Sequence, residues 1–379
     1  MVRLNFDQWV TFIILFGLTW VVWPFSISPF ELPKVWLFLL LVMILVVYQF
    51  IKVAKEWPKI SIFQTIPRWK WVAFLGVLGI CYVHLFVGGG GWGNQYRPQG
   101  ELIYLALAGW FLFSEKLNLS LKTWGNLGLF SLVGLAMSAV LIGPREGWRF
   151  VGFFGEPNSL AAASLFYLGL TLYLSGYRRW IGVLLATSLV LASGSRGGVY
   201  GLILMMFFWI GWKWRWWRWS MLGISIVGFV LLTILVLRVG DLTLEKPGVY
   251  QENRAEIWKV SWEIGVQNPL FGVGFENFEK AFKDRTAETN KEVQFLTVDS
   301  AHNIWLQWWA SGGLLGAFLL TWLVVRSGWE YWNTDRTVWF ISLIGLLAVQ
   351  FFTPVSIGVL AYFWWLLAGI SPKDQVSIA

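Results

Sequence analysis

Residues 299–325 read DSAHNIWLQWWASGGLLGAFLLTWLVV and decide the fold, because a polar loop here gives way to a long apolar run. The run from residue 302 to 325 has the length that a helix needs to cross a bilayer, about 20 residues. His302, one of only two histidines in the chain, stands where loop and run meet. Histidine gains and loses a proton near neutral pH. The stretch therefore predicts a membrane helix with a proton-exchanging side chain at its polar end.

The whole chain has the composition of a membrane protein. Its 379 residues are 57% hydrophobic and only 13% charged, and the mean hydropathy is +0.61. A soluble protein carries about twice this charged fraction. No segment of the sequence shows the alternating pattern of a membrane β-barrel strand. We therefore expect an all-α polytopic membrane protein.

Tryptophan and cysteine usage add two constraints. Many of the 29 tryptophans stand at segment ends, as Trp20 and Trp329 do. Indole rings favour the headgroup zone of a membrane, so we interpret most of them as interfacial anchors, with stacking on sugar rings as the alternative for a few. The single cysteine, Cys81, excludes an intramolecular disulfide and a cysteine-cluster metal site.

Twelve apolar segments predict membrane-spanning helices. They cover residues 8–25, 33–51, 70–87, 101–114, 125–142, 159–176, 180–193, 197–212, 220–238, 302–325, 337–352 and 355–370. Pro354 separates the last two, since proline ends or kinks a helix. The chain thus divides into residues 1–238 with nine spans, a polar loop over residues 239–301, and residues 302–379 with three spans and a cytoplasmic tail.

Positive charges predict how these spans are oriented. With the N-terminus in the cytoplasm, the inner segments hold sixteen lysines and arginines and the short outer loops hold five. Inner loops carry such an excess, so both termini are predicted to be cytoplasmic and the loop 239–301 to lie outside. The net charge of +8 is therefore mostly a sign of topology and does not indicate nucleic-acid binding.

The polar loop contains its own helical patterns. Residues 252–267 have apolar side chains at helical spacing and predict an amphipathic helix, which Asn268-Pro269 ends. Gly272 and Gly274 then predict a turn, and residues 277–285 a second short helix.

Two short loops on the same predicted side carry polar groups. In residues 155–159, Asn158 or Ser159 either caps the helix that follows or contacts a polar substrate. Residues 192–198 place Arg196 near a helix N-terminus, where backbone N–H groups and a guanidinium suit an anion. A salt bridge or a position at the membrane surface is the alternative for Arg196.

Arg254 and His302 complete the candidate set. Each has an ordinary alternative, a solvated loop arginine and a structural histidine at a helix end. Yet the predicted topology puts Arg196, Arg254 and His302 on one side of the membrane. Two arginines can neutralise a diphosphate and stabilise its departing charge, and a histidine can take a proton from an attacking hydroxyl. The acidic residues of the loop show no clear metal-site spacing.

These residues resemble the O-antigen ligase superfamily, which also includes O-antigen polymerases and some bacterial O-oligosaccharyltransferases. The resemblance covers about residues 150–320 and rests on Pro157-Asn158, Ser193-Gly194-Ser195-Arg196-Gly197-Gly198, Arg254 with Ile257-Trp258, Asn268-Pro269-Leu270-Phe271-Gly272-Val273-Gly274, Ala301-His302-Asn303 and Ser311-Gly312-Gly313-Leu314-Leu315-Gly316. Each motif is weak alone, and their order and spacing together are specific for the superfamily.

The resemblance implies a GT-C-type glycosyltransferase in the bacterial inner membrane. Such enzymes transfer a glycan from undecaprenyl diphosphate to an acceptor on the periplasmic face, and ligases use a lipid A core sugar as that acceptor. The reaction inverts the anomeric carbon and needs neither a metal nor another cofactor. Arg196 and Arg254 would bind the diphosphate and His302 would activate the acceptor hydroxyl. The remaining motif positions that would contact substrate are Asn158, Ser195 and Asn303.

Two alternatives stay open at the level of sequence. An O-antigen polymerase or a protein O-oligosaccharyltransferase would share the fold and differ in the acceptor. A transporter also commonly has twelve spans, although transporters usually place polar groups at discontinuous helices near the membrane midplane. Here the polarity concentrates in the outer loop. Membrane lipid is an expected partner in every case.

Overall fold

The computed structural model describes residues 4–56, 66–87, 91–93, 97–114, 117, 119–212, 217, 219–225, 227–228, 254–289, 298–334 and 336–369. The helices are α1 (Phe6–Phe12), α2 (Leu32–Glu56), α4 (Arg68–Val87), α5 (Glu101–Phe113), α6 (Leu121–Ile142), α7 (Pro157–Thr171), α8 (Gly176–Ser193), α9 (Arg196–Gly211), α11 (Arg254–Gln267), α12 (Phe278–Thr289), α13 (Ile304–Asn333), α14 (Thr337–Gln350) and α15 (Ile357–Leu367). A two-stranded antiparallel hairpin of β1 (Pro144–Glu146) and β2 (Arg149–Phe150) is the sheet in this part of the chain.

The predicted all-α membrane protein is confirmed. Within the described residues, four helical stretches are long and apolar enough to cross a membrane: Leu32–Lys55, Arg68–Phe86, Leu121–Ile142 and Ile304–Asn333. Five further apolar helices are shorter, among them α14 and α15. The predicted span 220–238 lies mostly outside the described residues. The count of twelve spans stays a prediction.

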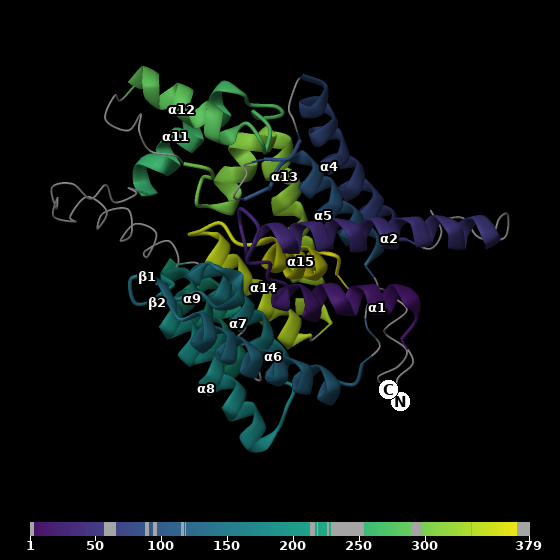
Figure 1. Ribbon diagram of the computed structural model, residues 1–379, viewed down its shortest axis with the longest axis vertical. Helices are drawn as coiled ribbons and strands as arrows, with labels where there is room; N and C mark the ends of the chain where they lie inside the picture. The colour runs from purple at the N-terminus through teal and green to yellow at the C-terminus, as the bar shows by residue number, and fades with distance from the viewer. Residues whose placement is uncertain are drawn as a thin grey trace.

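The centre of the molecule is made by helices that are apolar on every side. Every residue of α15 is buried, and so is nearly every residue of α7. A helix that is apolar on every side either lies in a protein core or spans a membrane, and the burial of α15 and α7 places both in the core. Figure 1 shows α15 in the middle, with α6 to α9 on one side and α4 and α5 on the other, and it contacts α5, α7, α13 and α14.

Small residues bring α9 close to its neighbours. A Cβ on Gly197 would lie 3.1 Å from the Cα of Val349 in α14, and one on Gly201 would lie 2.8 Å from the carbonyl oxygen of Gly345. Helices in membranes use such residues to let backbones approach. The start of α9, which carries Arg196, is therefore fixed against the end of α14.

The predicted span 302–325 differs from the observed helix in length and shape. Helix α13 runs from Ile304 to Asn333, and Gly313 interrupts it with φ 62° and ψ −159°. The interruption is filled by the segment that follows α11. Val273 N–H donates to the Ala310 carbonyl at 3.0 Å, and Leu314 N–H donates to the Pro269 carbonyl at 2.8 Å. Backbone groups released by the break are thus paired again.

This interlock explains the two glycine-rich motifs of the sequence. Gly272 has φ 71°, and a Cβ there would overlap the backbone of Ser311. A Cβ on Gly313 would overlap the backbone of Leu270 in return. Only glycine suits both positions, because positive φ and close approach occur together. Helix α11 packs on α13, and α12 packs on α11 (Figure 1).

The two helices predicted in the polar loop are confirmed with small shifts. The first begins at Arg254 and ends at Gln267, as predicted from residues 252–267, and the second covers Phe278–Thr289 rather than 277–285. Their apolar faces share one buried cluster with Ala301 and Phe352. The polar segment is therefore a packed layer whose core includes the residue before His302.

Candidate functional site

A pocket opens beside the start of α13. Its lining comes from four separate parts of the chain: the segment before α5, the segment between α11 and α12 with the first turn of α12, the residues around the start of α13, and the connection from α14 to α15. His302 and Asn303 both contribute to its wall.

His302 has an uncommon backbone conformation. Its φ is 51°, and among the described residues it is the one residue other than glycine with a positive φ. Left-handed backbone at such a residue costs about 1–3 kcal/mol and is found at functional sites more than elsewhere. The side chain is half-buried and lines the pocket.

The residues around His302 hold this conformation. Asn303 is the N-cap of α13, and its Oδ1 accepts from the N–H groups of Trp305 at 2.9 Å and Leu306 at 3.1 Å. The N–H of Ala301 donates to Gln307 Oε1 at 2.7 Å. Asn303, which the resemblance assigns to substrate contact, therefore has its side-chain oxygen engaged in capping.

Arg97 connects two of the candidate loops. Its Nη1 donates to both carboxylate oxygens of Asp299, at 3.0 and 3.2 Å, and its Nη2 lies 3.4 Å from Glu156 Oε1. Asp299 is three residues before His302, and Glu156 is two residues before Asn158. No local pattern in the sequence predicts partners that lie so far from Arg97 in the chain.

Arg149 makes a second connection, between the segments 155–159 and 192–198. Its Nε donates to the Ser193 carbonyl at 3.0 Å and its Nη2 to Asn158 Oδ1 at 3.3 Å. The two motifs that the sequence singled out as separate loops are thus neighbours in space. The partners of Arg149, like those of Arg97, are set by tertiary packing and not by a local sequence pattern.

The expected helix cap at Asn158 or Ser159 is wrong. The N-cap of α7 is Glu156, and Pro157 occupies the first helical position. Proline is favoured there because its missing N–H has no partner within the helix anyway. Ser159 instead donates to Glu156 Oε2 at 2.9 Å and accepts from the Ser356 N–H at 2.8 Å.

Ser195 and Arg196 form the start of α9. Ser195 is the N-cap, and its Oγ accepts from the Gly198 N–H at 3.1 Å. Arg196 is the first residue of the helix and is exposed. The position beside a helix N-terminus adds the positive end of the helix dipole to the charge of the guanidinium.

Three helices begin around one turn, Phe351–Phe352, which follows α14. Within these helices, Tyr200 of α9 contacts Phe352 with ring centroids 5.9 Å apart, and Trp258 of α11 contacts Phe351 at 5.6 Å. Trp305 of α13 contacts Phe351 at 5.9 Å. The first turns of α9, α11 and α13 therefore surround the same pair of rings.

This convergence locates the candidate residues relative to one another. Arg196 precedes Tyr200 by four residues and Arg254 precedes Trp258 by four, so each arginine lies one helical turn from the aromatic ring. Helix N-termini carry partial positive charge and bind anions. Arg196, Arg254, Asn158 and Ser195 are not among the residues that line the pocket, whereas His302 is. The pocket and the arginine-bearing helix starts are thus distinct regions. They meet at residues Ala301–Asn303, the His302 segment, because Ala301 packs in the cluster with α11 while His302 and Asn303 line the pocket.

The chain matches the family model described as O-Antigen ligase over residues 181–321. The match spans the start of α9, the two loop helices and the break in α13. No curated protein matches the sequence. In the described residues, no group of three or more histidine, cysteine, aspartate or glutamate side chains is arranged to hold a metal ion.

Proposed function

We propose that this chain is an O-antigen ligase, and the match of residues 181–321 to the O-Antigen ligase family model supports the proposal. It takes a glycan from undecaprenyl diphosphate and transfers it to a lipid A core sugar. It is a GT-C-type glycosyltransferase of the bacterial inner membrane, and it inverts the anomeric carbon without a metal ion. Both termini lie in the cytoplasm and the site faces the periplasm, as the distribution of basic residues supports.

The observation that carries the proposal is the convergence of three helix starts on Phe351–Phe352. Two of those starts bring an arginine, Arg196 and Arg254. Together with the helix dipoles, these guanidinium groups form a site for a doubly charged leaving group. A diphosphate leaves readily once its charge is offset, so electrostatic stabilisation is a large part of the required catalysis.

His302 supplies the proton transfer. Its imidazole accepts the proton of the acceptor hydroxyl, whose oxygen forms a bond to the anomeric carbon. The bond between that carbon and the diphosphate oxygen breaks, and its electron pair leaves with the diphosphate beside Arg196 and Arg254. Attack from the face opposite the leaving group inverts the anomeric configuration. Two observations support this role. His302 lines the pocket, and the preceding residue, Ala301, packs in the same cluster as α11.

The polymerase and the protein O-oligosaccharyltransferase belong to the same superfamily and differ in the acceptor. The glycans of a strain that lacks this chain distinguish a polymerase from a ligase. Loss of all polymer attached to the core indicates a ligase, whereas single repeat units left on the core indicate a polymerase.

The proposal is tested by glycan transfer in vitro. Purified protein receives undecaprenyl-diphosphate-linked glycan and lipid A core in the presence of a chelator, and His302→Ala is compared with wild type. Asp284→Asn, an exposed substitution on α12 away from the pocket lining, serves as the control. We expect transfer by wild type and control and its collapse in His302→Ala. Absence of transfer by the folded wild type contradicts the ligase assignment.

A further inference from the structure

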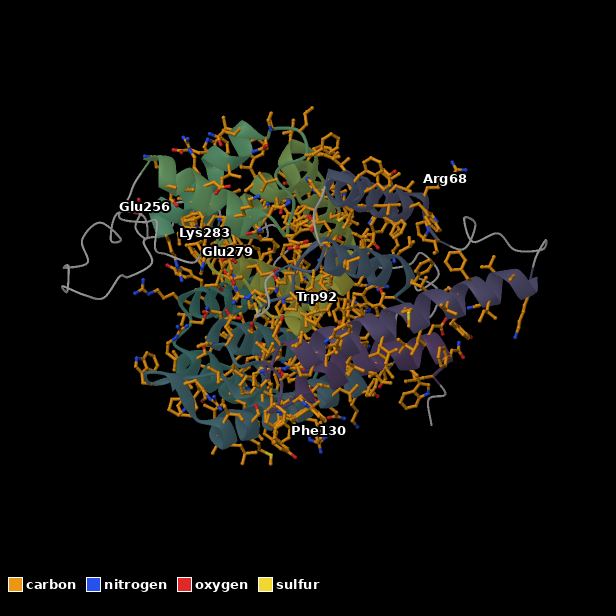
Figure 2. The ribbon with its side chains drawn as sticks, turned by 45° about the horizontal axis from the view of Figure 1, so that its top comes forward. Arg68, Trp92, Phe130, Glu256, Glu279 and Lys283 are labelled. Atoms are coloured by element: carbon orange, nitrogen blue, oxygen red, sulfur yellow. The ribbon has the colours of Figure 1, made fainter. Side chains whose placement is uncertain are left out.

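The pocket beside His302 is acidic, in contrast to the helix starts nearby. Its described lining includes three carboxylates, Glu276, Glu279 and Asp299, and one arginine, Arg97. Arg97 is held by Asp299 and by Glu156 outside the pocket. Glu279 lies 2.6 Å from Lys283 one turn along α12, and the two side chains stand together in Figure 2. Glu276 adds a further carboxylate to the lining of the pocket.

Two polar atoms of this lining are buried without a hydrogen bond. One is the Oε2 of Glu276, and the other is the Oγ of Ser300, a residue that is only 8% exposed. Buried polar atoms in proteins are nearly always hydrogen-bonded. A carboxylate oxygen accepts only and a hydroxyl both donates and accepts. Together they match a ligand that offers hydroxyl or amino donors.

The rest of the wall suits a sugar ring as well. Tyr104, Phe275, Trp308 and Trp364 all line the pocket and pack on one another, with Tyr104 and Phe275 stacked at 3.8 Å between ring centroids. Such a cluster of rings makes a rigid apolar face. Apolar walls with a few placed polar groups are the usual form of a small-molecule site.

From these observations we infer that the pocket is a subsite for an acceptor sugar that offers hydroxyl or amino donors to Glu276 and Ser300, and that it excludes sugars bearing a phosphate or a carboxylate. The inference deepens the proposed function, on which it rests for the identity of the pocket as the acceptor side. An anionic sugar would bring its charge against Glu276 and Glu279, and juxtaposed like charges are strongly unfavourable where water is excluded. An ammonium group would instead pair with Glu276.

The charge preference also keeps the two substrates apart. The diphosphate of the donor is drawn to the starts of α9 and α11 and repelled by the pocket, so it does not compete with the acceptor for the space beside His302. Specificity of this kind depends on a repulsive element as much as on an attractive one. The sugar unit that enters next to His302 is thus predicted to carry no anionic group.

The test uses four probes that share one ring and differ in charge. Methyl β-glucosaminide is cationic, methyl β-glucoside is neutral, and methyl β-glucuronide and glucose 6-phosphate are anionic. Binding of each probe to the full chain in lipid nanodiscs is measured by saturation-transfer NMR, with empty nanodiscs subtracted. We expect the glucosaminide to bind best, the glucoside next, and both anionic probes at least about tenfold more weakly than the glucoside.

Variants locate the effect. Glu276→Gln is expected to remove the advantage of the glucosaminide and to raise binding of the glucuronide, whereas the control Asp284→Asn leaves the order unchanged. Ser300→Ala, which alters no charge, is expected to weaken all four probes alike. If a variant fails to fold, the order in which the four probes bind to wild type still tests the inference.

The outcomes separate this inference from the proposed function. Anionic probes that bind as tightly as the glucoside, or an order that Glu276→Gln leaves intact, overturn the inference. If the probes bind in the expected order while no transfer from undecaprenyl diphosphate occurs, the subsite stands and the proposed function falls. Efficient transfer to an anionic acceptor sugar overturns the inference and leaves the proposed function in place.

Discussion

The starts of α9 and α11 differ in charge from the pocket before α13. The first region has Arg196 and Arg254 at two helix N-termini, with one carboxylate, Glu256, in the first turn of α11, and the second has three carboxylates against one arginine. The His302 segment belongs to both, because Ala301 packs in the cluster under α11 while His302 lines the pocket. A base placed between two substrates of unlike charge can thus be served by two binding regions of unlike charge.

The largest expected effect comes from removing positive charge at the helix starts. Arg196→Gln or Arg254→Gln is expected to lower kcat by about 10²–10³, as loss of one donor to a developing anion does elsewhere. Arg285→Gln, which breaks an ion pair with Glu263 between α12 and α11, is the matched control. Initial rates at saturating donor measure the effect. A change of less than threefold in both arginine variants contradicts the assignment of the diphosphate to this region.

Arg97 is predicted to act by positioning, since it ties the segment before His302 to the start of α7. Arg97→Gln is expected to reduce kcat by about 10–100-fold, because a small misplacement of a catalytic group is costly. The KM for the donor is expected to stay within about twofold, since the diphosphate region is separate. Arg97→Lys should restore part of the rate. If KM rises and kcat does not fall, Arg97 binds the donor instead.

The interlock between α13 and the segment that follows α11 can be broken by a single methyl group. Gly272→Ala adds a Cβ that overlaps the Ser311 backbone at positive φ, and it is expected to destabilise the protein by about 1–3 kcal/mol. Gly79→Ala is the control, because a Cβ at this helical position meets nothing within 4 Å. Alanine there is expected to stabilise by about 0.5–1 kcal/mol. Thermal unfolding in detergent compares the two, and equal midpoints argue against the interlock.

The smallest effect is expected at Ser195. Ser195→Ala removes the oxygen that accepts from the Gly198 N–H, and such a loss costs about 1 kcal/mol in helix stability. If Arg196 depends on this cap for its position, the transfer rate falls by a few fold, and Ser195→Asp, which retains a capping oxygen, recovers it. Recovery by Ser195→Val, which has no capping group, would show that the cap is not the cause.

The apolar segments could be predicted because length and composition alone distinguish a membrane helix. The helix over 254–267 could be predicted because apolar positions recur along residues 252–267 at a spacing that is local. The break at Gly313 could not, because it depends on residues 269–274 inserting from another part of the chain. The sequence shows the glycines of both motifs, but it does not show that they let the two segments approach each other.

The candidate site shows the same limit. His302, Arg196 and Arg254 stand at helix starts, which polar residues before apolar runs reveal in the sequence. The contact between Arg97 and Asp299 joins residues 202 positions apart, and no local pattern predicts it. The orphaned oxygen of Glu276 and the left-handed backbone of His302 likewise arise only when the chain is packed.

Donor diphosphate and acceptor sugar are proposed to bind on opposite sides of the His302 segment. The most direct test measures binding of farnesyl diphosphate and of methyl β-glucosaminide to wild type, Arg254→Gln and Glu276→Gln in nanodiscs. We expect Arg254→Gln to weaken binding of the diphosphate and to leave binding of the glucosaminide unchanged, and Glu276→Gln to do the reverse. One variant that weakens both ligands in a folded protein, or an exchange of the two effects, contradicts it.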